Sequence, residues 1–429
     1  MRNYKAIILI TVLLAAMLGG CTKFNDRSAY PKKDFVMIYY CAGFNDLSSS
    51  IQGNLDVMKK ADIPFKESKH KLLVYSHFSV SDGNFSTLTP SHLVQLSKNY
   101  GKLQADTLLT IDPTRFATDP AVMNEVLEKV QELFPGSRYG LVVSSHGTGW
   151  LPAGKYSSGN VIQFSKKRPG QTEQGPDQPE QSHGAALPLY RYNENPDEPR
   201  VKTFGAEVKM EDGKKYSQEM SIQSMAAAIP LHLDYLLFDA CLMGGIEVAY
   251  ELKDVADKVA FSPTEVLAAG FDYSDISSLL GDEPSIESFC KLYFDHYDKA
   301  GSYATITVVK SSELDALAQT CKKMFDKYRS GISMLNTVSG IQPYFRSGHH
   351  WFYDLEDILD KAGINADDRT ELSRAINSSI SYKATTAQFL EIRINTYSGL
   401  SMYLPGAGDA SLNEFYKTLA WNKATNLVE

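Results

Sequence analysis

The stretch YLLFDACLMGGIEVAYEL, residues 235–252, contains the transition that decides the fold of this chain. Its first four residues form a continuous apolar run, as expected of a central parallel strand that is buried on both faces. Two glycines then precede a segment with apolar residues at helical spacing. The stretch therefore predicts a strand, a turn and a helix, with the thiol of Cys241 at the carboxyl end of the strand.

A second predicted strand ends in the same way. The apolar run YGLVV at 139–143 is followed directly by SSHG, which places His146 just beyond the strand. In open parallel sheets, sites form beyond the carboxyl ends of the strands. If the two strands are neighbours, the imidazole of His146 and the thiol of Cys241 face each other at that edge.

A cysteine and a histidine in these positions are suited to nucleophilic catalysis. The field at a helix N-terminus and a nearby imidazolium both favour the thiolate of Cys241, which is the nucleophilic form. His146 would protonate the leaving amine, and the amides of Gly147 and Cys241 would stabilise an oxyanion. From these residues alone a structural role stays open, because a cysteine at a strand end often serves packing.

The order of the predicted elements indicates an α/β fold. Apolar runs typical of strands occupy residues 34–43, 70–78, 106–112, 139–143 and 233–240, and residues 257–266 predict one more strand followed by a loop. Segments typical of helices occupy residues 53–61, 119–134, 217–229 and 244–256. The rest of the chain continues with helices at 284–298, 311–328, 354–362 and 367–380 and strands near 303–309 and 398–404. This order predicts a mostly parallel central sheet with helices on its faces.

Residues 151–217 differ in composition from the rest of the chain. The segment AGKYSSGNVIQFSKKRPGQTEQGPDQPEQSHG is rich in Gly, Pro, Gln and Lys and has little hydrophobic periodicity. Such a composition is typical of a long exposed insertion. The sequence thus predicts an insertion between the two strand ends that carry His146 and Cys241.

The overall composition indicates a globular protein with a substantial core. The chain has 429 residues, 43% of them hydrophobic, and a formal net charge of −8. No strongly basic patch stands out, so we expect no nucleic-acid partner. The five cysteines include no C-x-x-C pair and the nine histidines form no ligand pattern, so we expect neither a metal site nor a cofactor. Cys41 is expected to lie in the core, and Cys290 and Cys321 are expected to be buried or half-buried thiols.

The N-terminus predicts export and a lipid anchor. A positively charged start precedes an apolar segment, residues 6–18, that is short for a membrane span. Two glycines then precede Cys21, which resembles a bacterial lipoprotein signal; an ordinary signal peptide with a chance cysteine is the alternative. We therefore expect a signal peptide at 1–20 and a tether at 21–33, lipidated on Cys21, that anchors the protein in the bacterial cell envelope, at the outer membrane and facing either the periplasm or the cell surface.

The segments SSHGTGW and FDACLMGGIEVAYEL together resemble the two catalytic motifs of the clostripain family of cysteine peptidases, relatives of caspases, legumain and gingipains. Further segments that resemble the family are DFVMIYYCAGFNDLSSSIQGNLDVMKKA, AFSPTEVLAAGFDY, FYDLEDIL and SGLSMYLPG. These correspond to its first strand, Asn-Asp loop and first helix, to the loop after its catalytic strand, and to its C-terminal segments. The resemblance covers most of the mature chain and keeps the family's motif order.

The resemblance implies a caspase-like α/β/α sandwich at residues 34–275, with 276–429 as a C-terminal α/β extension packed on it. It implies a membrane-anchored cysteine endopeptidase that hydrolyses protein or peptide substrates. It assigns Cys241 as the nucleophile, His146 as the general acid and base, and Gly147 with Cys241 as the oxyanion hole. Some family members use calcium, but no loop in this sequence demands it. We expect a monomer.

Asp239 is the candidate substrate-binding residue. It lies two positions before Cys241 and matches an aspartate under the family's primary specificity pocket; capping of the next helix is the alternative role. Clostripain-like enzymes favour Arg or Lys before the scissile bond, which requires acidic groups in that pocket. This chain has Ala268 and Ala269 where basic-specific members bring a further acidic residue, and Asp272 is a nearby candidate to replace it. Cleavage after Arg or Lys is therefore a hypothesis.

Activation by cleavage is a second hypothesis that the resemblance suggests. Family members are often activated by a cut between the histidine and the cysteine, and residues 151–217 lie in that interval. The basic residues there are Lys155, Lys166, Lys167, Arg168, Arg191, Arg200 and Lys202. A plain surface loop is the alternative.

Two other functions are compatible with the sequence. One is a catalytically degenerate, peptidase-like lipoprotein that binds a peptide or glycan. The alanine-rich pocket loop favours this reading, whereas the presence of both His146 and Cys241 argues against it. The other is a thiol-based acyltransferase or amidase, because a Cys–His dyad specifies acyl chemistry and not the acceptor.

Overall fold

The computed structural model describes residues 33–81, 83–155, 190–191, 204–346 and 350–429. Residues 34–429 form one compact unit. The signal peptide predicted at 1–20, Cys21 and nearly all of the tether lie outside the described residues. Within the part that the structure describes, no helix is long and apolar enough to cross a membrane.

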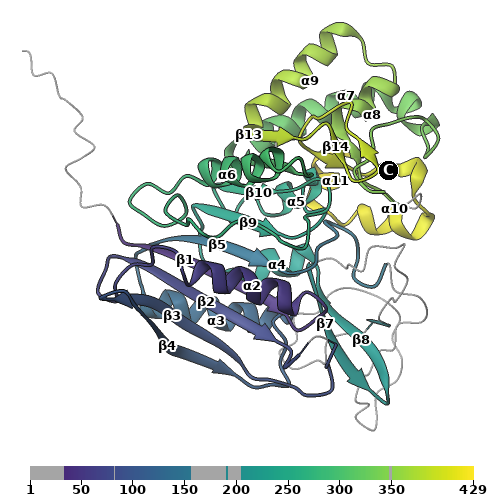
Figure 1. The fold of residues 1–429 in the computed structure, drawn as a ribbon. Helices are drawn as coiled ribbons and strands as arrows, with labels where there is room; N and C mark the ends of the chain where they lie inside the picture. The colour runs from purple at the N-terminus through teal and green to yellow at the C-terminus, as the bar shows by residue number, and fades with distance from the viewer. Residues whose placement is uncertain (1–32, 82, 156–189, 192–203, 347–349) are drawn as a thin grey trace, which may run out of the picture. The chain divides into compact units, whose positions relative to one another are not determined.

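A nine-stranded sheet organises the described residues (Figure 1). Its strands are β1 (Phe35–Gly43), β2 (His70–Phe78), β3 (Ser91–Asn99), β4 (Lys102–Ile111), β5 (Arg138–Ser144), β9 (Tyr235–Asp239), β10 (Lys258–Phe261), β11 (Thr305–Lys310) and β13 (Ile380–Thr385). They run in the order β13-β11-β10-β9-β5-β1-β2-β3-β4. The run from β10 to β2 is parallel, and antiparallel strands extend it at both edges. The mostly parallel central sheet is thus present.

Helices cover both faces of this sheet, with a hydrophobic core on each face. One core contains α2 (Ser48–Met58) and α6 (Ile286–Lys299); the other contains α3 (Pro120–Leu133), α4 (Ile222–Ala228), α5 (Ile246–Glu251) and α7 (Leu314–Met334). Along β1 the side chains alternate between the two cores, with Ile38 and Tyr40 in one and Met37 and Tyr39 in the other. Because both faces are covered, the central strands need the continuous apolar runs that the sequence shows.

The C-terminal third shares the sheet and a core with the preceding residues. Besides β11 and β13 it contributes α8 (Leu355–Lys361), α9 (Ala366–Ser379), α10 (Ala410–Tyr416), α11 (Ala420–Thr425) and the short strands β12 (Tyr353–Asp354), β14 (Gln388–Phe389), β15 (Ile392–Arg393) and β16 (Ser401–Met402). The buried carboxylate of Glu247, in α5, accepts hydrogen bonds from the Tyr403 amide at 2.8 Å and the Tyr416 hydroxyl at 2.7 Å. Burial raises the pKa of Glu247 to about 7. Strands from both sides of residue 275 pair in one sheet, because β10 pairs with β11. The domain boundary predicted at 275 stays a prediction.

Some predicted elements are displaced in the structure. The helix predicted at 217–229 begins only at Ile222, because residues 214–220 form β8 (Lys214–Met220), which pairs with β6 (Tyr190–Arg191) and β7 (Phe204–Glu211). Ser221 caps α4 by accepting the Ser224 amide at 3.0 Å. Strand β3 was not predicted, because its sequence SHLVQLSKN is half polar, with only part of the strand buried.

Residues 204–217, assigned above to an exposed insertion, are buried in large part. Phe204, Ala206, Glu207 and Val208 are at most 1% exposed. Their segment mixes charged and apolar residues, so its composition resembled that of a surface loop. The strand β7 instead packs beside the loops that follow the central strands.

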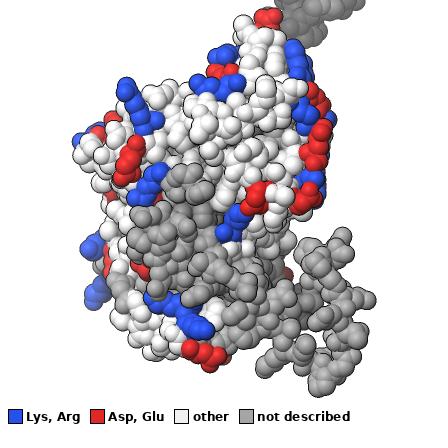
Figure 2. Space-filling view, turned by 90° about the vertical axis from the view of Figure 1, so that its right-hand side faces the viewer, with Lys and Arg blue, Asp and Glu red and all other residues white. Residues whose placement is uncertain are grey.

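Charged side chains of both signs lie next to each other on the face drawn in Figure 2. Pairs along helices, such as Lys291 with Asp295 and Lys322 with Asp326, add to this mixing in the described chain. The described residues on this face therefore form no broad field of one sign that would attract a polyanion.

Candidate active site

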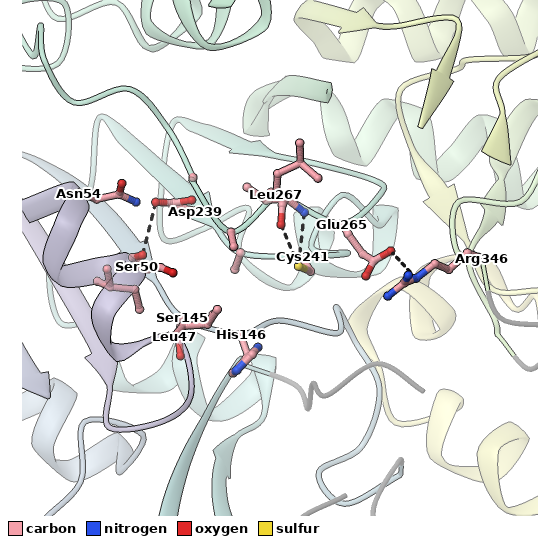
Figure 3. A pocket seen from close by; sticks show the side chains of 16 residues that line it. Leu47, Ser50, Asn54, Ser145, His146, Asp239, Cys241, Glu265, Leu267 and Arg346 are labelled. Carbon is pink, nitrogen blue, oxygen red and sulfur yellow. Dashed lines mark hydrogen bonds and ion pairs between the residues drawn. The ribbon is translucent and has the colours of Figure 1, made fainter. Parts of the chain in front are cut away.

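A cavity of about 190 Å³ lies beyond the carboxyl ends of β5 and β9. The two strands are parallel neighbours, with Ser144 opposite Asp239, so the residues that follow them meet at one edge. Figure 3 shows His146 and Cys241 on facing sides of this cavity, with Asp239 at one end. The lining residues are Leu47, Ser50, Ile51, Asn54, Ser144, Ser145, His146, Asp239, Ala240, Cys241, Glu265, Val266, Leu267, Ala268, Gly270 and Arg346.

The imidazole of His146 is held by a carboxylate. His146 is buried, and its Nε2 lies 2.7 Å from Oδ1 of Asp46, in the turn after β1. A neutral ring that donates through Nε2 keeps Nδ1 as its proton acceptor. Asp46 therefore sets the tautomer that a general base needs.

The turn that carries Asp46 is tied to the loop that carries His146. The Ser145 hydroxyl donates to the carbonyl oxygen of Ala42 at 2.6 Å, and the side-chain amide of Asn45 donates to the same oxygen at 3.1 Å. The Asn45 side-chain oxygen in turn accepts the Leu47 amide at 2.9 Å. These bonds fix the two loops relative to each other.

The thiol of Cys241 is half-buried and makes both of its polar contacts with Val266. Sγ accepts the Val266 amide at 3.3 Å and donates to the Val266 carbonyl oxygen at 3.6 Å. Burial, and after it the carboxylate of Glu265, raises the pKa of Cys241 to about 12, and the Val266 amide opposes both. In this arrangement the thiol is protonated and faces the loop after β10 instead of the imidazole (Figure 3).

The backbone around the thiol is unusually close to the histidine loop. A Cβ on Gly147 would lie 2.6 Å from the carbonyl oxygen of Cys241, so only glycine permits this approach. Leu242, the next residue, has a φ of 58° in the left-handed region, and its amide donates to the Thr264 carbonyl oxygen at 2.8 Å. A strained turn thus presents Cys241 beside Gly147, where the predicted oxyanion hole would form.

Asp239 lies at the end of the cavity away from the thiol's Val266 contact (Figure 3). Its Oδ2 accepts the Tyr273 hydroxyl at 2.9 Å and the Ser144 hydroxyl at 3.4 Å. Burial raises the pKa of Asp239 to about 6, and the two hydroxyls oppose this. A Cβ on Gly270, whose φ is +64°, would lie 3.1 Å from both carboxylate oxygens, so the glycine leaves them open to the cavity. Asp239 does not cap α5, whose N-cap is Gly245.

A second carboxylate lies at the other end of the cavity. Glu265 Oε2 is 3.4 Å from Nε of Arg346, a residue of the C-terminal third. Burial raises the pKa of Glu265, and Arg346 opposes this. Asp272 is not among the described residues that line the cavity: it is well exposed and accepts the Ser274 amide at 2.9 Å. The suggestion that Asp272 replaces the missing acidic group is therefore wrong.

Sequence reasoning missed several residues of this site. Asp46 follows the end of an apolar strand run, as His146 and Cys241 do, and the rule on strand ends was enough to identify it. Glu265 and Arg346 carry no such signal. Of the predicted sites, Cys21 lies outside the described residues.

Comparisons with known proteins identify the family and the fold. The model of the clostripain family matches residues 210–426, just over half of the chain. An inactive zymogen of a C11 protease from Parabacteroides distasonis has 26% sequence identity and a TM-score of 0.70, over 92% of this chain and 99% of that one. A secreted C11 cysteine protease from Bacteroides thetaiotaomicron, in complex with an irreversible peptide inhibitor, has 23% identity and a TM-score of 0.68 over the same shares. No curated protein matches. The predicted caspase-like α/β fold is confirmed.

Proposed function

The chain belongs to the clostripain family of cysteine peptidases, and we propose that it is an endopeptidase in which Cys241 is the nucleophile and His146 the acid and base. One observation carries this proposal. Both side chains line a single cavity beyond neighbouring parallel strands, and Asp46 holds the imidazole there.

The geometry supports the following sequence of steps. After Sγ of Cys241 turns away from Val266, Nδ1 of His146 takes the thiol proton and the thiolate attacks the substrate carbonyl carbon. The amides of Gly147 and Cys241 stabilise the oxyanion. His146 then protonates the leaving amine and later activates the water that hydrolyses the thioester, while Asp46 stabilises the imidazolium. All these groups come from one chain, so we expect the monomer to be active.

A covalent probe tests this assignment. The full-length protein would be incubated with a peptidyl-Arg acyloxymethyl ketone beside Cys241→Ala and His146→Ala. We expect labelling of the wild type alone. Equal labelling of Cys241→Ala would exclude this cysteine as the nucleophile.

We propose that the carboxylate of Asp239 binds the side chain of an Arg or Lys that precedes the scissile bond. Its carboxylate is open to the cavity beside Gly270 and Asn54, and above its pKa of about 6 it carries the charge that a basic side chain needs. Cleavage rates would be compared for peptides that have Arg, Lys or Leu immediately before the scissile bond. Equal rates for all three would refute this preference.

Cleavage within 151–217 is proposed as an activating step. Lys155 is the one basic residue of this segment, among those given in the sequence analysis, whose side chain the structure describes. Its Nζ lies 2.6 Å from Oδ2 of Asp409. Cleavage of Cys241→Ala would be followed beside the wild type during expression. If both are cut at the same rate, another protease is responsible.

The proposed anchor is a lipid on Cys21, which would place the peptidase in the cell envelope. A Cys21→Ala variant should move from the membrane fraction to the soluble fraction, and mass spectrometry of the wild type should show the acylated N-terminus. Retention of Cys21→Ala in the membrane fraction would contradict the anchor.

A further inference from the structure

We propose that Glu207, in β7, is a positioning residue for catalysis: its buried carboxylate holds together the loops that present Asp46 and His146. This inference rests on the proposed function, because it assumes that His146 is the acid and base.

The carboxylate of Glu207 is fully buried and joins three parts of the chain. Its Oε1 accepts the amide of Phe44, directly after β1, at 3.4 Å, and lies 2.8 Å from Nδ1 of His77 in β2. Its Oε2 accepts the amide of Thr118, between β4 and α3, at 3.3 Å. One side chain thus satisfies donors from three neighbouring loops and strands.

The hydrogen bond between Glu207 and His77 is enclosed in the protein. The second ring nitrogen of His77, Nε2, lies 3.1 Å from the Thr89 carbonyl oxygen, so the ring is held at both nitrogens. The Phe44 ring stacks on the His77 ring with centroids 4.7 Å apart. Because a buried carboxylate that loses its hydrogen-bond partners is costly, these contacts fix the position of β7.

The strand β7 then reaches both members of the His–Asp pair through its backbone. The Val208 amide donates to the carbonyl oxygen of Phe44 at 2.8 Å, two residues before Asp46. The Gly205 amide donates to the carbonyl oxygen of His146 at 3.0 Å. Glu207 lies between these two donors, so its displacement would move the loops of Asp46 and His146 relative to each other.

A conservative substitution, Glu207→Gln in the full-length protein, tests this role. Glutamine keeps the size of the side chain but replaces one carboxylate oxygen with an NH2 group. That NH2 group would face the backbone N–H of Phe44 or of Thr118, and two donors form no hydrogen bond, so one of the two contacts is lost. We expect kcat on a peptide substrate to fall about tenfold to a hundredfold with little change in KM, since a shift near 1 Å is enough for such a loss.

Glu219→Gln is the matched control. Glu219 is also buried, on β8 of the same hairpin, but it accepts the Gly154 amide at 2.9 Å and not the amides of the Asp46 turn. Both variants should lower the melting temperature, whereas only Glu207→Gln should lower kcat. Equal kcat values for the two variants would show that Glu207 has only a structural role.

A readout without turnover separates this inference from the proposed function. In a Cys241→Ala background, NMR would record the ring-nitrogen chemical shifts of His146; Glu207→Gln should change them, because the ring is displaced from Asp46, whereas Glu219→Gln should not. Unchanged ring-nitrogen shifts together with an unchanged kcat overturn the role of Glu207. Activity that survives Cys241→Ala overturns the catalytic assignment instead.

A second substitution keeps the inference testable if Glu207→Gln does not fold. Glu207→Asp retains the carboxylate, but the side chain is one methylene shorter, so we expect that it does not reach the amides of Phe44 and Thr118 together. The same fall in kcat is expected, and wild-type kcat in a folded Glu207→Asp protein overturns the inference.

Discussion

Nε2 of His146 lies 2.7 Å from Oδ1 of Asp46, a residue 100 positions earlier in the chain. The two residues follow β5 and β1, which are parallel neighbours, so the contact forms when these strands pair. Asp46 is partly exposed, whereas the His146 side chain is nearly buried. The carboxylate therefore orients the ring through Nε2, and Nδ1 is the nitrogen left to accept a proton.

Asp46→Asn should lower kcat about tenfold to a hundredfold, because the ring loses both its fixed tautomer and the charge that stabilises the imidazolium. The pH profile of kcat/KM should change on its acidic limb, and the melting temperature should hardly move. Steady-state kinetics between pH 5 and 9 would check this. An unchanged profile would mean that Asp46 does not act through His146.

Glu265 and Arg346 should act in opposite directions on the thiol. Glu265 raises the pKa of Cys241 and Arg346 lowers it. Glu265→Gln should therefore speed alkylation by iodoacetamide at pH 8, and Arg346→Gln should slow it. Alkylation rates of the two variants against pH measure this directly, and a change in the same direction for both would contradict the electrostatic explanation.

The preference for basic residues should depend on pH. Since the pKa of Asp239 is about 6, its carboxylate is about one-tenth ionised at pH 5 and almost fully ionised at pH 7.5. The ratio of kcat/KM for Arg-ended to Leu-ended peptides should rise about tenfold between these pH values. Asp239→Asn should remove the rise. A ratio independent of pH in the wild type would show that Asp239 does not bind the basic group.

The ionised carboxylate of Asp239 should also lower the free energy of unfolding at neutral pH. Its pKa is raised from 3.8 to about 6, so the folded state disfavours the ionised form. Stability is therefore lost as the pH rises from about 4 to about 6, and the full loss, roughly 3 kcal/mol, is present above that range. Asp239→Asn should raise the free energy of unfolding by about 2 to 3 kcal/mol at pH 7.5 but not at pH 4. Denaturant unfolding at both pH values would measure it, and an equal gain at both would argue against this cause.

Gly270→Ala should close the basic pocket. The new Cβ would lie 2.5 Å from Nδ2 of Asn54 and 3.1 Å from the carboxylate oxygens of Asp239. The kcat/KM for Arg-ended peptides should fall about tenfold relative to Leu-ended ones. Because alanine is strained at this left-handed φ, the free energy of unfolding should also fall by about 1 to 2 kcal/mol. Gly281→Ala is the control, since its Cβ would meet its nearest neighbour only at 3.7 Å. Equal selectivity in both variants would place the basic group elsewhere.

Much of the fold was predictable because its central strands are buried on both faces. β1, β2 and β5 have continuous apolar runs, and their predicted bounds lie close to the observed ones. Strand β3 and the hairpin of β7 and β8 were not predicted, since their segments mix polar and apolar residues. Polar side chains in these segments form hydrogen bonds with residues far away in the sequence, as Glu207 does with His77.

The sequence by itself determined which groups stand at the ends of the central strands, among them His146, Asp239 and Cys241. It did so because strand runs and the turns after them are local patterns. Only the tertiary structure decided what surrounds these groups: Asp46 on the imidazole and Glu265 with Arg346 near the thiol. Such partners are separated along the chain by up to 105 positions (346 − 241) and are chosen by strand order and close packing, which no local pattern records.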